Sequence, residues 1–427
     1  MATVDHSQTL QTAVEKISGR AWLILSIPWL MIIIGAILNF AIGVMIPSMQ
    51  EDIGFGAAQA GTLSSISWFI TALVTIPLTA LINRYGPKLM LTIILFAMGA
   101  LILVQGAATS YSVLLIARGL GLGLVAGLAP ALVLLKQMWV GPSKIVTVNG
   151  VEAFTNPAGQ VLSTALVPTL LVMFSGWRTT VYFIGGLSLL MAIIWLFVGA
   201  EKSYTTKASQ TGEKSGESAI ETFTAAARVK AIWLLAFAWP GTTLVWIAFF
   251  TFWPTFAVEK LGISLTTAGL ILSALPIGSI VASLTAPIIC DKWGKEKPMI
   301  WMWGLILPVC YYAMLATSNT VLLVIASFAA GFGAFAFVPP GLSLPYKIGL
   351  NPKVVAMGMA IMMTLITLGG AAGPVIAGNI IESSGDLFKA LAICCLSPLT
   401  LFIFGIFLPE RGRLALEREA REAKSAS

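Results

Sequence analysis

The stretch Ala80–Lys88, ALINRYGPK, is a short polar turn between two long apolar runs, and a related stretch, IICDKWGKEK, occurs at Ile288–Lys297. Asn83 and Asp291 hold the same place in the two copies and lie 208 residues apart. Five pairs of glycines recur at the same offset: Gly54/Gly262, Gly61/Gly269, Gly86/Gly294, Gly123/Gly331 and Gly150/Gly358. The repeat predicts one structural unit used twice in the chain.

The composition places both copies in a membrane. Of the 427 residues 58% are hydrophobic and only 10% are charged, and the mean hydropathy is +0.92, whereas a soluble domain has about 25% charged residues. Twelve apolar runs can each cross about 30 Å of hydrocarbon. Backbone groups in lipid must bond internally, so these runs predict helices. The short alternating segments of a β-barrel are not found.

Polar breaks divide the chain into five predicted segments. They are an N-terminal tail (1–20), a six-helix bundle (21–199), a linker rich in Ser, Thr, Lys and Glu (200–230), a second six-helix bundle (231–408) and a C-terminal tail (409–427). The end of the linker, residues 219–230, is expected to form a short surface helix.

Basic residues set the predicted orientation. With the N-terminus inside, 21 of the 25 Lys and Arg residues lie on the cytoplasmic side, while Arg178, Lys260 and Lys389 lie outside. This asymmetry predicts a multi-pass protein of the cytoplasmic membrane with both termini cytoplasmic. It also accounts for the net charge of +7 without a nucleic-acid partner. Both halves start on the same side, which predicts parallel repeats about an axis along the membrane normal.

The motifs in both halves resemble those of the major facilitator superfamily. The first turn is similar to its G-x-L-x-D-R-x-G-R-R signature through Arg84, Gly86 and Lys88, although Ala80 replaces a glycine and Asn83 an aspartate. Further similar stretches are Asp291–Lys295 in the second turn, RGLGLGLVAG (118–127), NPAGQ (156–160), SGWR (175–178) and GGAAGP (369–374). The resemblance covers essentially the whole chain, with a weak leaning to anion and cyanate-permease-like branches. It implies an all-α membrane protein of twelve transmembrane helices, a monomer whose two pseudo-symmetric six-helix bundles rock around a midplane site.

The two turns are predicted to act as conformational latches, because the resemblance implies that their charges lock the turn against neighbouring helix ends in one conformer. The residues concerned are Asn83, Arg84, Gly86 and Lys88 in the first turn and Asp291, Lys292, Gly294 and Lys295 in the second. Asn83 has no charge, so the first latch should be the weaker. The alternative is that the basic residues only anchor the positive-inside orientation.

Small residues and prolines predict helix packing and breaks. Gly119, Gly123 and Gly127 recur every four residues and share a helix face, where small residues allow close approach in lipid. Gly373 and Pro374 are expected to pack a helix in the same way. Pro339, Pro340 and Pro345 should break the tenth span.

Two charges fall inside apolar spans, Arg118 and Glu152. A charge at the bilayer centre costs at least about 2.5–3.5 kcal/mol on insertion scales, so each needs a partner or a task. Arg118 either bonds backbone carbonyls of the first helix or binds an anionic substrate as a bidentate fork. Glu152 either exchanges protons or caps a helix or pairs with Lys136 or Lys144.

A substrate cavity is expected where spans 1, 4, 7 and 10 meet, as the resemblance implies. Aromatic rings with a few polar groups suit a small organic ligand. The candidate residues are Asn39, Trp68, Arg118, Asn156, Gln160, Trp239, Thr242, Thr243 and Trp246.

The sequence predicts a transporter and not an enzyme. The only histidine is His6, in the N-terminal tail, and Cys290, Cys310, Cys394 and Cys395 form no ligand constellation, so no metal or other cofactor is expected. We expect proton-coupled uptake of a small organic or inorganic anion. Proton-coupled efflux of amphiphilic compounds is the alternative, and a membrane-embedded enzyme or a receptor is a third, weaker hypothesis because no phosphate-binding or hydrolase motif is present.

Overall fold

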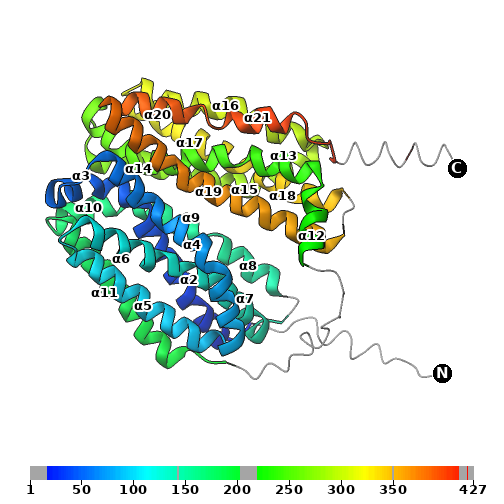
Figure 1. Cartoon of the computed structure of the whole chain (residues 1–427), viewed down its shortest axis with the longest axis horizontal. Coiled ribbons are helices and arrows are strands. Elements are labelled where there is room, and N and C mark those ends of the chain that lie inside the picture. The colour runs from blue at the N-terminus through cyan, green and yellow to red at the C-terminus, as the bar shows by residue number, and fades with distance from the viewer. Residues whose placement is uncertain (1–16, 142–143, 202–218, 349–350, 413–420, 422–427) are drawn as a thin grey trace.

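A computed structural model describes residues 17–141, 144–201, 219–348, 351–412 and 421. Most of the predicted N-terminal tail, the centre of the linker and most of the C-terminal tail lie outside these residues. Every regular element in the described part is helical, and the helices form two bundles that meet along one side (Figure 1).

The first half follows the predicted order of spans. Its elements are α2 (Gly19–Phe40), α3 (Ile42–Ile53), α4 (Ala57–Tyr85), α5 (Pro87–Ala107), α6 (Tyr111–Gly123), the 3-10 turn η2 (Leu124–Gly127), α7 (Leu128–Trp139), α8 (Ile145–Ala153), α9 (Thr155–Ala165), α10 (Val167–Met173) and α11 (Trp177–Val198).

The second half repeats this order after a short helix in the predicted place. Its elements are α12 (Ala219–Ala227), α13 (Lys230–Ala238), α14 (Pro240–Leu261), α15 (Leu265–Trp293), α16 (Lys297–Ala316), α17 (Thr320–Ala336), α18 (Val338–Lys347), α19 (Pro352–Ser384), α20 (Leu387–Cys395) and α21 (Leu399–Gly405).

Eleven helical segments of the described residues are long and apolar enough to cross a membrane. The remaining predicted span, near Ile145, consists of α8, α9 and α10, which are each too short alone. Pro157 lies in the first turn of α9 and Pro168 in that of α10. Proline cannot bond backward along a helix, so it begins a new one. The predicted all-α architecture of membrane-spanning helices is therefore confirmed.

Spans 1, 4, 7 and 10 are all interrupted near their middle. The interruptions lie at Ala41, at η2, at Trp239 and at Phe337. Pro240 directly follows the third break, and Pro339 lies just after the fourth, in the first turn of α18. The predicted break in the tenth span is thus confirmed. Broken helices at membrane depth are tolerated where they are buried in protein or line a cavity.

Two of the repeated glycine pairs adopt backbone conformations that other residues rarely adopt. Gly54 and Gly262 end α3 and α14 with φ of 79° and 68°, and Gly86 and Gly294 follow α4 and α15 with φ of 86° and 68°. These conformations favour glycine because it has no Cβ. The sequence repeat at these positions is therefore a repeat of turn geometry.

The two halves contact each other near one end of the molecule, which we call the seam end. The contacts join α4 to α19, α9 to α15 and α3 to α14. In Figure 1, α3, α10, α14 and α20 lie at this left-hand end, while α7, α12 and α18 lie towards the other end, where the bundles diverge. The halves are therefore packed together at one end only.

Large apolar side chains cover much of the outer surface. Leu73, Ile76, Val172 and Phe197 are 71–84% exposed. An apolar surface of this extent is unfavourable in water but matches hydrocarbon. The chain is therefore a multi-pass membrane protein whose outer faces contact lipid.

Candidate functional site

A cavity of about 260 Å³ lies between the two halves. The first half contributes α2, α4 and α9 to its wall, and the second half contributes α14, α17, α18, α19 and the break at Trp239. The lining residues are Phe40, Trp68, Asn156, Gln160, Trp239, Thr242, Thr243, Trp246, Ile247, Ala334, Phe335, Val338, Ile366, Thr367 and Gly370. No charged side chain is among them.

Seven of the nine predicted cavity residues come together in this wall. They are Trp68, Asn156, Gln160, Trp239, Thr242, Thr243 and Trp246. Asn39 and Arg118 are not part of it, and span 4 contributes no lining residue. The lining residues that the sequence reasoning missed include Phe40, Phe335 and Thr367, which are not distinguished in sequence from other residues of apolar spans.

Arg118 is directed into the first bundle. Its guanidinium donates to the carbonyl oxygens of Leu63 (3.0 Å), Leu38 (3.2 Å) and Asn39 (3.1 Å), and the residue is 1% exposed. The break after Phe40 lies next to two of these carbonyls. Within the described residues no carboxylate pairs with Arg118. Of the two predicted roles, this geometry matches the bonding of helix carbonyls.

The threonine hydroxyls of the cavity are arranged to accept hydrogen bonds. The hydroxyls of Thr242, Thr243 and Thr367 donate to the carbonyls of Trp239 (2.7 Å), Ile366 (2.9 Å) and Met363 (2.8 Å). A hydroxyl has one donor and two acceptor lone pairs, so each can only accept from a solute.

Gln160 adds a further acceptor. Its Nε2 donates to Asn156 Oδ1 at 2.7 Å, while its Oε1 is buried without a partner. The residue is 6% exposed. A buried acceptor without a donor costs about 1–3 kcal/mol. Because this oxygen has almost no open surface, a solute in the cavity can donate to it only after the Gln160 side chain turns.

A chain of aromatic rings connects the halves beside the cavity. Trp68 contacts Phe40 at a centroid distance of 6.2 Å, Phe40 contacts Phe250 of the other half at 4.9 Å, and Phe250 contacts Trp246 at 5.4 Å. Edge and tilted arrangements of this kind are favourable. The aromatic wall is thus shared by both bundles.

Glycines allow the backbones of the two halves to touch at the seam end. A Cβ on Gly61 of α4 would overlap the carbonyl oxygen of Pro374 and lie 2.8 Å from its carbonyl carbon. A Cβ on Gly269 of α15 would likewise overlap the carbonyl oxygen of Thr164. These two glycines are one of the pairs separated by 208 residues. The structure therefore explains the pair by equivalent contacts across the seam.

The other predicted packing residues lie inside the halves. Gly119 and Gly123 face Ile66 and Ile70 of α4, and Gly127 faces Ile94 of α5. Gly373 lies against the backbone of Leu244 in α14, in its own half, whereas the adjacent Pro374 faces the seam.

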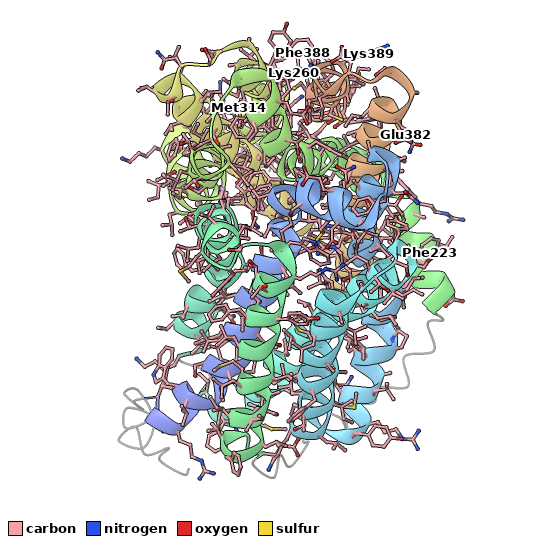
Figure 2. The ribbon with its side chains drawn as sticks, turned by 90° about the vertical axis from the view of Figure 1, so that its left-hand side faces the viewer. Phe223, Lys260, Met314, Glu382, Phe388 and Lys389 are labelled. Carbon is pink, nitrogen blue, oxygen red and sulfur yellow. The ribbon has the colours of Figure 1, made fainter. Side chains whose placement is uncertain are left out.

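Glu382 is a seam residue that the sequence did not single out. Its Oε2 accepts from the backbone N–H of Ala58, at the start of α4, at 3.2 Å. Figure 2 looks onto the seam end and shows Glu382 next to the helices of the first half. The N-terminus of a helix carries partial positive charge, so this carboxylate stabilises the contact between the halves.

Glu152 lies in a polar cluster away from the cavity. Its Oε2 is 2.9 Å from Lys136 Nζ and accepts from Trp29 Nε1 at 3.2 Å. Lys136 also donates to Asn149 Oδ1 at 2.8 Å. The contact with Lys136 is one of the alternatives predicted for Glu152.

The charged side chains of the two predicted latches are exposed in this conformation. They include Arg84, Lys88, Asp291, Lys292 and Lys295, and within the described residues none of them forms an ion pair. Carboxylates from the ends of the bundles hold both turns instead. Glu201 accepts from the backbone N–H of Lys88 at 2.6 Å, and Glu410 accepts from that of Glu296 at 2.9 Å.

The SGWR stretch closes the seam end of the first half. Arg178 Nε donates to Asp52 Oδ2 at 2.7 Å, and Trp177 Nε1 donates to the same oxygen at 3.0 Å. The hydrogen bond from Arg178 is the main cause that lowers the pKa of Asp52. The contact links the end of α3 to the start of α11.

Two repeated bundles with an uncharged cavity between them are the arrangement expected of a membrane transporter. The sequence model of the Major Facilitator Superfamily matches residues 28–374 and 238–427. The chain belongs to this family, as its motifs predicted.

Named relatives and a solved structure agree with this assignment. The hexuronate transporter of Bacillus subtilis is 24% identical over 85% of this chain and 90% of its own length. The nitrite extrusion protein of the same organism is 23% identical over 94% of this chain and 99% of its own. A bacterial homologue of the human lysosomal transporter Spinster, in an inward-facing and unoccupied conformation, is 17% identical, with a TM-score of 0.74, covering 92% of this chain and 95% of that one.

Proposed function

We propose that this protein is a secondary transporter that carries a small organic solute across the cytoplasmic membrane by alternating access, without changing it chemically. The proposal rests on the cavity lined by both halves, with the halves packed together at one end only. A solute in this cavity contacts both bundles, so rocking of one bundle against the other can expose it to either side.

The proposed orientation places the seam end outside. It rests on the excess of Lys and Arg in the connections at the opposite end, which would lie in the cytoplasm together with both chain termini. In this orientation the present conformation is closed to the outside. Modification of single cysteines at Ser110 and Ser343 in intact cells by a membrane-impermeant reagent tests it, and we expect labelling only at position 110.

A small anion is the substrate that the relatives favour, since hexuronate, an organic anion, and nitrite, an inorganic one, appear in their names. Arg118 gives little support for an anionic substrate, because its guanidinium bonds three backbone carbonyls and does not line the cavity. Neutral donors in the wall would then have to hold the acidic group. The indole N–H groups of Trp68, Trp239 and Trp246 make no hydrogen bond within the described residues.

Coupling to protons is the proposed energy source, with Glu152 as the exchanging group. Its carboxylate contacts Lys136 of α7 and the indole of Trp29 in α2. Protonation would remove the ion pair with Lys136 and weaken the bond from Trp29. A proton could in this way change the packing of span 5, whose next segment carries Asn156 and Gln160.

Uptake into proteoliposomes with an imposed pH gradient tests the proposal. Gradient-driven accumulation of a radiolabelled hexuronate is the expected result, and Glu152→Gln should abolish the stimulation by the gradient. Transport by this variant that remains fully pH-dependent would exclude Glu152. Chemical conversion of the solute without accumulation would contradict the transporter itself.

Efflux of amphiphilic compounds is the alternative, and the uncharged aromatic lining favours it. Transport measured in right-side-out and inside-out vesicles separates the two directions. Accumulation confined to inside-out vesicles would assign export.

A further inference from the structure

We propose that the central cavity takes a ring-bearing solute that presents hydroxyl or N–H donors, and that it does not take a compact inorganic anion or an organic cation. This inference deepens the proposed function and rests on the same cavity.

The first argument is that the wall contains hydrogen-bond acceptors that need donors from the solute, beside the indole donors described above. The three lining threonines already donate to backbone carbonyls, so their free lone pairs accept only. Gln160 Oε1 is a buried acceptor with no partner. If the side-chain amides of Asn156 and Gln160 were turned together, the unpaired group of Gln160 would be its Nε2 donor instead of its Oε1 acceptor. The threonine acceptors would be unchanged. A solute that has no donor leaves these acceptors unpaired.

The second argument is that the aromatic residues and the volume of the cavity suit a solute that contains a ring. Trp68, Trp239, Trp246 and Phe335 line the cavity from both halves, and aromatic rings pack favourably against a ring of the solute. A cavity of about 150 Å³ can hold benzene, so about 260 Å³ has room for one ring and its substituents. A linear or very small solute would leave part of this surface without contact.

The third argument is that the cavity wall has no charged side chain that could pair with a compact ion. The lining contains no acidic or basic side chain, and burying a compact ion without a partner is unfavourable. Arg118 is a buried charge beside the wall, because it bonds the carbonyls directly before Phe40. Its positive charge opposes a cation, although the indole faces alone would attract one.

The test measures binding to the purified full-length protein without a gradient, by isothermal titration. The ring probes are glucuronate, uridine and 4-hydroxybenzoate, and the counter-probes are nitrite and choline. We expect at least one ring probe to bind and both counter-probes to fail. The O- or N-methylated counterpart of the bound probe, which lacks one donor, should bind about tenfold more weakly.

A substitution identifies the acceptor. Gln160→Met keeps the side-chain length but removes the acceptor, and it should abolish the difference between the bound probe and its methylated counterpart. Gln105→Met is the matched control, because Gln105 is equally buried, in α5, outside the cavity. It should keep the difference in full.

Several results would overturn the inference. They are preferential binding of nitrite or choline, failure of all three ring probes at millimolar concentration, equal binding of the methylated counterpart, and a difference that persists in Gln160→Met. Binding without accumulation in liposomes would contradict only the proposed transport. Accumulation of nitrite without ring binding would contradict only the solute class.

Discussion

Replacement of Gly61 by alanine should open the seam end. The added methyl group would overlap the carbonyl oxygen of Pro374 and lie 2.8 Å from its carbonyl carbon, whereas carbon atoms in contact are about 3.5–4.0 Å apart. The two backbones must therefore separate by about 1 Å. Because both contacting groups are backbone, no side-chain rotation can relieve the overlap.

The size of the effect follows from the cost of overpacking, which is about 1–3 kcal/mol. A conformer in which the halves are apart at this end does not bear this cost. The ratio of the two conformers should thus shift towards the opened one by about 5- to 150-fold, since 1.4 kcal/mol corresponds to a factor of ten.

Spin labels at Ser110 and Ser318 provide the assay. Both residues are exposed at the seam end, one in each half, and they are 208 residues apart in sequence. Pulsed dipolar spectroscopy on a background without the four native cysteines should show a new, longer distance in Gly61→Ala. Gly269→Ala should give the same result, because it makes the equivalent contact with Thr164.

Two controls separate gating from general damage. A Cβ on Gly186 meets nothing within 4 Å, so Gly186→Ala should leave both distance and melting temperature unchanged. Gly123→Ala overpacks against Ile70 inside the first half and should lower the melting temperature without the longer distance. An unchanged distance in both Gly61→Ala and Gly269→Ala would refute the role of the seam glycines.

Four further substitutions test other contacts. Glu382→Gln removes a charge from the N-terminus of α4 and should shift the same conformer ratio by about two- to fivefold at low salt; a ratio equal to that of the unmodified protein would contradict this role. Asn83→Asp should strengthen the first latch and favour the opened seam, and an unchanged transport rate and conformer ratio would count against a latch. Asp52→Asn should lower the melting temperature at pH 7, and the difference should vanish as the pH falls through the lowered pKa of Asp52, because a depressed pKa stabilises only while the group is ionised; a difference that persists well below this pKa would exclude the ion pair. Arg118→Lys should lower the melting temperature by leaving helix carbonyls unpaired while the affinity of the cavity is kept, so lost affinity with unchanged stability would show that Arg118 binds the solute.

The spans and the duplication could be predicted because they depend on local composition. Apolar runs and the glycine offset can be recognised in the sequence without knowing how the helices face one another. Most of the polar cavity residues followed from the same logic, since polar side chains inside apolar spans seldom face lipid.

The orientation of individual side chains could not be predicted in this way. Arg118 is a single buried charge in sequence, and whether it faces the cavity or the helix carbonyls depends on the rotation of α6 within its bundle. Gly61 and Gly123 are likewise indistinguishable in sequence, although one contacts the other half and the other contacts its own. The hydrogen bond between Ala58 and Glu382 joins residues 324 positions apart, and no local sequence pattern predicts it.

The seam glycines also bear on how a duplicated gene can diverge. A contact between a glycine and a main-chain carbonyl does not depend on the surrounding side chains. Neighbouring positions can therefore change while the contact between the two halves keeps its geometry. The two copies can therefore acquire different recognition surfaces for a solute and still move as matched partners. In this way the seam pair Gly61 and Gly269 can keep its offset of 208 residues.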